Sequence, residues 1–167
     1  MRIIIAPCER KWYDKVCAKC FPYWEEVVAK LEERGHHLIQ VSQLHNTRYV
    51  KDFRLDSYGN NLSLNAISNI FYNDRADTFI TIDSFFQHLA HNVEKKVNPG
   101  GIVIFSKTDP QVFGYPENVN LLKDRKYIRE KWWRVWKEEP YDKDAFVTAD
   151  EVVRAVENYG KLKKEAK

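Results

Sequence analysis

Residues 79–90 read FITIDSFFQHLA, and this stretch decides the fold. Its first four residues are β-branched or aromatic, which is typical of a buried strand, and the strand ends at an acid. The chain then turns directly into a helix, which Asp83 or Ser84 can cap because a short side-chain oxygen accepts from the first-turn N–H groups. Such a helix directs N–H groups and the positive end of its dipole above the sheet. The stretch therefore predicts an anion site, with His88 one turn along and facing the same side.

The composition of the chain sets the class of protein. Its 167 residues are 44% hydrophobic and 31% charged, which predicts one soluble globular domain. The net charge of +3 is too small to indicate nucleic-acid binding by itself. No window approaches about 18 consecutive apolar residues, and the first apolar run, interrupted at Pro7, is too short for a signal peptide. We therefore expect a cytoplasmic protein without a transmembrane segment.

Strand and helix patterns alternate along most of the chain. Gly35 and Gly160 are predicted to end helices, and residues 42–61 are the hardest to assign, with a short helix or strand near 49–55. The alternation predicts an α/β fold: a Rossmann-like, mainly parallel sheet of about five or six strands with helices on both faces. Strands are expected over 2–6, 37–41, 78–82, 102–105 and 119–122, and helices over 23–34, 61 to about 74, 84 to about 94, 127–138 and 148–159.

The composition shifts after residue 122, so we expect a core over 1–122 and a helical extension over 123–167, within a single domain overall. Between Lys123 and Lys137 there are seven Lys or Arg residues against two acids, with three tryptophans among them. The favoured interpretation is that this basic, Trp-rich segment packs on the core. A partner surface is the second alternative, and an interfacial or nucleic-acid contact is the third. The tryptophans are Trp132, Trp133 and Trp136.

Three loops are predicted to open at the carboxyl edge of the sheet with chemistry that suits a phosphate. The first loop follows the strand over 2–6, the second begins at Asp83, and the third, residues 106–110, reads SKTDP. Basic side chains at that edge can neutralise a phosphate, although a solvated loop with scattered cations would have a similar composition. The loop after the first strand carries Arg10, Lys11, Lys15 and Lys19.

The same residues carry a resemblance to a known family. Residues 83–90, DSxxxHLA, together with Thr108-Asp109-Pro110 and the Gly-containing loop after it, resemble glycosyltransferase family 9, the heptosyltransferase-like enzymes of the GT-B fold. Residues 3–7, IIIAP, followed by Arg10-Lys11 and by FPYW at 21–24, fit the start of that family's carboxy-terminal, nucleotide-sugar-binding domain. The resemblance covers roughly residues 1–122.

This resemblance implies a function and a set of site residues. It implies sugar transfer from a nucleoside-diphosphate donor to an unknown acceptor, with no cofactor and no metal. In the family the nucleoside diphosphate lies on the N-terminus of the helix after an Asp-Ser/Thr-Gly turn. By position, the residues implied around the diphosphate-sugar are Asp83, Ser84, the amide of Phe85 and His88, with Arg10, Lys11 or Lys15 as the counter-charge and Thr108 and Asp109 near the sugar or phosphate.

Two departures from the family pattern leave alternatives open. Phe85 stands where the family has glycine, and the family's amino-terminal domain has no counterpart in the chain. Transfer needs a second set of groups near the reacting carbon, so a second copy, a separate partner chain or the tail would have to supply them. The alternative is a non-catalytic nucleotide-binding module: a sensor, a sequestering protein or a subunit of a split enzyme. A weaker alternative is a nucleic-acid-associated protein that acts through the tail.

The three cysteines form no disulfide framework, because their number is odd and they lie within thirteen residues. Cys8, Cys17 and Cys20, with His36 or His37, contain the elements of a zinc site, but the second CxxC that would indicate one strongly is absent. Reduced, partly buried thiols are the preferred interpretation.

Overall fold

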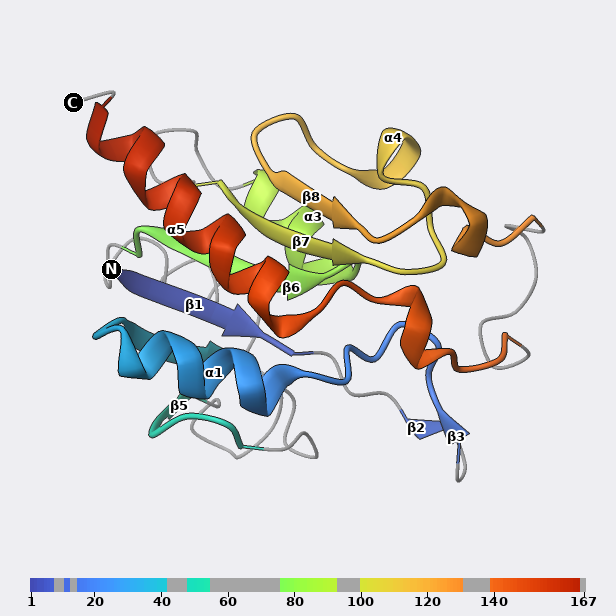
Figure 1. Cartoon of the computed structure of the whole chain (residues 1–167), viewed down its shortest axis with the longest axis horizontal. Helices are drawn as coiled ribbons and strands as arrows, with labels where there is room; N and C mark the ends of the chain where they lie inside the picture. Colours follow the sequence, from blue (N-terminus) through green and yellow to red (C-terminus); the bar gives the residue numbers. More distant parts are fainter. Residues whose placement is uncertain are drawn as a thin grey trace.

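The computed structural model describes residues 1–7, 11–12, 15–41, 48–54, 76–92, 100–130 and 139–165. Within these residues the central element is a six-stranded sheet in the order β5-β4-β1-β6-β7-β8, in which every strand pair is parallel (Figure 1). The strands are β1 (Arg2–Ala6), β4 (His37–Val41), β5 (Asp52–Arg54), β6 (Thr78–Ile82), β7 (Gly101–Phe105) and β8 (Val119–Leu122).

This strand order is that of a doubly wound Rossmann-type sheet. Numbered by their sequence in the parallel sheet, the strands lie 3-2-1-4-5-6, so the direction of winding reverses between β1 and β6. The predicted Rossmann-like α/β fold is confirmed. A two-stranded antiparallel ribbon, β2 (Lys11–Trp12) with β3 (Lys15–Val16), lies in the loop after β1.

Helices cover both faces of the sheet. Helices α1 (Trp24–Glu33) and α5 (Ala149–Glu165) lie on one face, and α3 (Phe85–Asn92) lies on the other, behind the sheet in Figure 1. The side chains of β1 alternate accordingly: Ile3 and Ile5 pack with α1 and α5, whereas Ile4 packs on the α3 side. Right-handed crossovers that run in opposite directions from β1 and β6 place their helices on opposite faces.

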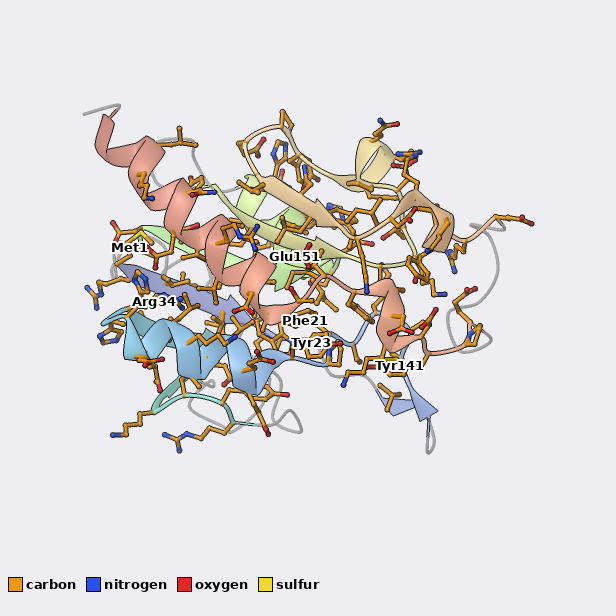
Figure 2. All side chains as sticks on the ribbon, in the orientation of Figure 1. Met1, Phe21, Tyr23, Arg34, Tyr141 and Glu151 are labelled. Atoms are coloured by element: carbon orange, nitrogen blue, oxygen red, sulfur yellow. The ribbon has the colours of Figure 1, made fainter. Side chains whose placement is uncertain are left out.

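The larger core lies on the α1–α5 face. Helix α1 buries Trp24, Val27, Val28 and Leu31, the residues of its apolar stripe. Aromatic rings close this core at the carboxyl end of the strands, where the Phe21 ring lies 5.5 Å from that of Tyr23 and 5.9 Å from that of Phe146 (Figure 2). All residues of β6 and β7 are buried, as expected for central strands covered on both faces.

Helix α5 begins as the sequence predicts but ends later. Thr148 and Glu151 form a capping box, with the Thr148 N–H donating to Glu151 Oε2 at 2.7 Å and the Glu151 N–H donating to Thr148 Oγ1 at 3.3 Å. The prediction that Gly160 ends the helix is wrong, because α5 continues to Glu165. A Cβ at Gly160 would lie 2.9 Å from Met1 Sδ, so this glycine serves close packing. Gly35, with φ of 76°, does follow the end of α1.

The predicted helix over 127–138 is wrong at its start. Residues Arg125–Tyr127 form a short 3₁₀ helix, η1, and Ile128 is extended, with φ of −63° and ψ of 128°. Next to it, the Arg129 N–H donates to the Lys107 carbonyl at 2.9 Å, so a hydrogen bond to the loop after β7 replaces the helical bond. Residues 131–138, which contain the three tryptophans, lie outside the described residues.

Other local predictions have mixed outcomes. The ambiguous segment near 49–55 contains strand β5, and the predicted loop 106–117 contains α4 (Pro110–Phe113), a single turn. The predicted helix from 61 to about 74 lies outside the described residues. None of the described helices combines the length and the apolar character needed to cross a membrane.

Candidate anion site at the carboxyl edge of the sheet

The loops that follow β1, β6 and β7 meet at one edge of the sheet, at the point where the winding reverses. The Thr81 hydroxyl donates to the Ala6 carbonyl at 3.1 Å, and the Ser106 hydroxyl donates to the Ala18 carbonyl at 3.2 Å. The Asp83 N–H donates to the Ile104 carbonyl at 3.0 Å. Ligands of doubly wound sheets bind at this edge, because the chain there diverges to opposite faces and leaves a crevice.

Asp83 joins the three loops. Its side chain is buried, and the residue is 5% exposed. Oδ2 accepts from Lys19 Nζ at 2.7 Å and from the Thr108 hydroxyl at 2.5 Å, while Oδ1 accepts from Gln87 Nε2 at 2.6 Å. A buried carboxylate needs such donors to offset its lost hydration. Asp83 therefore holds the loops in place through its own hydrogen bonds. We define Lys19, Asp83, Ser84, Gln87 and Thr108 as the Asp83 corner.

Ser84 is the N-cap of α3. Its hydroxyl accepts from the Phe86 N–H at 3.3 Å, and its carbonyl accepts from the Gln87 N–H at 3.2 Å. Of the two capping candidates in the sequence, Ser84 is therefore the one that caps, because the Asp83 carboxylate is directed to its three donors. Phe85 is the first residue of α3 and is 58% exposed. The positive end of the α3 dipole thus lies at the edge where β1 and β6 end.

His88 is directed toward the β7–β8 connection. Its Nδ1 lies 2.8 Å from the Tyr115 hydroxyl. On the same helix, the His91 ring stacks on Tyr115 with ring centroids 3.7 Å apart, and His91 Nδ1 lies 2.5 Å from Glu117 Oε1. The contacts of His88 in this structure therefore attach α3 to the loop before β8.

Thr108 and Asp109 are adjacent in sequence but have different partners. Thr108 belongs to the Asp83 corner, whereas Asp109 caps α4 by accepting from the Gln111 N–H at 2.9 Å. Arg125 also donates to both carboxylate oxygens of Asp109, at 2.6 and 3.2 Å. The Arg125 guanidinium, with the Gln111 N–H, holds the pKa of Asp109 below its ordinary value.

Within the part of the chain that the structure describes, Lys19 is the basic residue of the Asp83 corner. The resemblance implies Arg10, Lys11 or Lys15 as the counter-charge, but Arg10 and the side chains of the other two lie outside the described residues. Lys19 Nζ contacts Asp83 twice, through Oδ2 and through the carbonyl at 3.0 Å. The sequence placed Lys19 among the four basic residues of this loop but did not single it out, because the chemistry of the four is similar.

Two more basic residues lie beside the corner: Lys107, which the sequence placed in the loop 106–110, and Arg129, which sequence reasoning did not single out. Lys107 is almost fully buried, with Nζ 3.9 Å from Asp142 Oδ2. Burial lowers the pKa of Arg129, while the charges of Glu139 and Asp83 act in the opposite direction. Both residues line a cavity of about 460 Å³. Its described lining consists of Lys107, Thr108, Asp109, Val112, Phe113, Ile128 and Arg129.

The cysteines contribute no described metal site. Cys17 and Cys20 are buried in one turn, in which the Cys20 N–H donates to the Cys17 carbonyl at 2.8 Å. Cys8 lies outside the described residues. Among the residues that the structure describes, no three His, Cys, Asp or Glu side chains are grouped so that they could hold a metal ion.

Comparison of the chain with protein-family models, with curated proteins and with solved structures finds no match. The structure itself defines the class of protein: an α/β protein with a doubly wound parallel sheet and a polar corner at its switch point.

Proposed function

We propose that the chain binds a nucleoside diphosphate, or a sugar conjugate of one, at the carboxyl edge between β1 and β6. In this proposal it is the donor-binding domain of a glycosyltransferase of heptosyltransferase type. The observation that carries the proposal is the placement of the Ser84-capped N-terminus of α3 beside Lys19 at the switch point of the sheet. Helix N-termini and lysines at such points are well suited to phosphate groups.

The corner supplies two kinds of groups to a diphosphate. The first-turn amides of α3 and its dipole favour negative charge near Ser84. Lys19 has a side chain that is 23% exposed, in contrast to the 6% of the Asp83 side chain that it contacts, so solvent and small anions have access to it. Asp83 orients Lys19 without exposing its own negative charge to the ligand.

A non-catalytic binding module is the second candidate, and the state of Asp83 favours it. A general base for sugar transfer must accept a proton from the acceptor hydroxyl. The Asp83 carboxylate is buried and already accepts hydrogen bonds from Lys19, Thr108 and Gln87. Within the described residues we assign no catalytic base at the corner. In this proposal a second copy or a separate partner chain would complete a transferase.

Substitution of the cap residue tests the phosphate site without removing the cap. Aspartate and asparagine both cap helices well, so Ser84→Asp and Ser84→Asn should both fold. We expect ADP, GDP, UDP, CMP or one of their sugar conjugates to raise the melting temperature of the wild-type chain at millimolar concentration. Ser84→Asn should keep this shift, and Ser84→Asp should lose it because its carboxylate repels the phosphate. An equal shift in both variants, or no shift with any nucleotide, would refute the proposal.

A product assay separates the two candidates. Release of free sugar or nucleotide from the stabilising donor by the purified chain alone would support the transferase. Donor binding without turnover, under the same conditions, would show that the chain alone is a binding module, which leaves catalysis to a separate partner chain.

A further inference from the structure

The cavity of about 460 Å³ lies beside the Asp83 corner and has a different chemistry. Its described walls come from the loop after β7, from α4 and from residues 128–129, and they include neither Asp83 nor Ser84. Thr108 connects the two places, since it lines the cavity while its hydroxyl donates to Asp83. The volume is in the range of small-molecule sites, roughly 300–1,000 Å³.

The charged groups in the described wall favour an anion. Lys107 and Arg129 are basic, and the acid among the described lining residues, Asp109, already accepts from Arg125 and from the Gln111 N–H. Asp142 approaches Lys107 Nζ to 3.9 Å, which is longer than a hydrogen bond. A phosphate or carboxylate group within reach of both cations would form charge-assisted hydrogen bonds in a partly buried position.

The remaining described walls are apolar and accessible. Val112 is 70% exposed and Phe113 is 39% exposed, and Ile128 contributes a third hydrophobic side chain to the same cavity. Covering such surface stabilises a complex by about 25 cal/mol for each Å² removed from water. The apolar residues and the two cations therefore suit a ligand that is apolar at one end and anionic at the other.

We infer that this cavity is a binding site for a small organic anion, such as the phosphate monoester of an aromatic group. The phosphate is held by Lys107 and Arg129, and the apolar body lies against Val112, Phe113 and Ile128. This site lies beside the Asp83 corner and shares Thr108 with it, but its described lining includes neither Lys19 nor Ser84, on which the proposed nucleotide site rests. The inference rests on the composition of the cavity wall, whereas the proposed nucleotide site rests on the α3 N-terminus and Lys19.

Phenyl phosphate is a suitable probe, with inorganic phosphate and phenol as its two halves. We expect a heteronuclear NMR titration of the whole chain with phenyl phosphate to shift the amides of residues 107–113 and 128–129 in a saturable manner. Each half alone should bind at least about tenfold more weakly. Shifts confined to residues 83–87, equal affinity for inorganic phosphate, or no saturable shift at all would overturn the inference.

Two exposed apolar residues provide a matched pair of variants. Val112→Asp places a negative charge at the cavity and should weaken phenyl phosphate binding by at least about tenfold. Leu162→Asp makes a similar change on α5, at a residue that is 63% exposed and is not in the described lining, and should leave binding unchanged. Equal binding by Val112→Asp and the wild-type chain would count against the site.

Ser84→Asp separates this inference from the proposed function. The variant should lose the nucleotide-dependent stabilisation but retain phenyl phosphate binding, because Ser84 is not in the described cavity lining. Loss of phenyl phosphate binding in Ser84→Asp would place the probe at the corner and overturn the inference. If no nucleotide binds to any variant, the proposed function fails, whereas the phenyl phosphate result still decides the cavity.

Discussion

Asp83 and Asp109 lie at corresponding places in the chain, each between a parallel strand and the helix that follows it, but their side chains have different roles. Asp109 caps α4, the helix that follows it, and pairs with Arg125 from the segment after β8, whose side chain is largely exposed. Asp83 leaves the capping of α3 to Ser84 and binds Lys19 and Thr108 from two other loops.

The difference follows from burial and from position in the sheet. Strand β6 is flanked by β1 and β7, so a side chain at its carboxyl end meets the loops of both neighbours. No residue of α4 is buried and the Asp109 side chain is 19% exposed, so water has more access to its carboxylate than to that of Asp83, which is 6% exposed. Asp83, whose side chain is buried, thus connects three loops, whereas the partly buried Asp109 caps its own helix and pairs with one exposed arginine.

Replacing each acid with alanine should show the largest difference between them. We expect Asp83→Ala to reduce the free energy of unfolding by about 3 kcal/mol, because it leaves Lys19, Gln87 and Thr108 without their shared acceptor. Asp109→Ala should cost about 1 kcal/mol, the usual effect of losing a helix cap. Urea denaturation of both variants measures this, and equal losses would contradict the distinction.

Double-mutant cycles should show a smaller difference between the two acids, again with the larger value for Asp83. For Asp83→Asn with Lys19→Met we expect a coupling free energy of about 2 kcal/mol, since the pair is partly buried and joins two loops. The cycle of Asp109→Asn with Arg125→Met should give a clearly smaller value, because its arginine is solvent-exposed. A larger coupling for the exposed pair would show that burial does not govern these interactions.

The smallest expected effect is the contribution of the Asp109 charge to the free energy of unfolding, which the pH dependence of stability should reveal. The pKa of Asp109 in the folded chain is lowered chiefly by Arg125, so the ionised form is stabilised by folding. This contribution is complete above the unfolded pKa of about 3.9 and is lost as the pH falls through the lower folded value. Asp109→Asn keeps a capping side chain but lacks this dependence.

The free energies of unfolding of Asp109→Asn and the wild-type chain should therefore converge as the pH is lowered from 7 to about 2. Chemical denaturation at a series of pH values measures the difference. A difference that grows toward acid pH would contradict the assigned role of Arg125.

Local sequence patterns predicted much of the fold. The strands over 2–6, 37–41, 78–82 and 119–122 have the predicted bounds, and the strand-to-helix turn at residues 79–90 is present. These features depend on β-branched runs, helical periodicity and capping residues, all of which act within a few positions. The same reasoning failed at Gly160, where α5 continues alongside Met1, and at Ile128, whose neighbour Arg129 donates its N–H to the loop after β7.

The candidate site was predictable in its place but not in its connections. Residues 83–84 and 106–110 are at the edge that the alternation of strands and helices predicted. The partner of Asp83 was not predicted, because Lys19 is 64 residues away and several basic residues in the same loop have similar chemistry. Lys107 was predicted at this edge as part of residues 106–110, but its pairing with Arg129 in one cavity was not, because the two become neighbours only when the chain after β8 returns to the β7 loop.

The sequence by itself determined that residues 79–90 form a strand, a capped turn and a helix, because hydrogen bonding and apolar periodicity are local properties. Tertiary structure alone decided that Asp83 would be buried, that Ser84 would be the cap, and that Lys19 and Thr108 would be the partners of the acid. The physical reason is that burial removes water as a competing partner, and only the packing of distant loops determines which donors replace it.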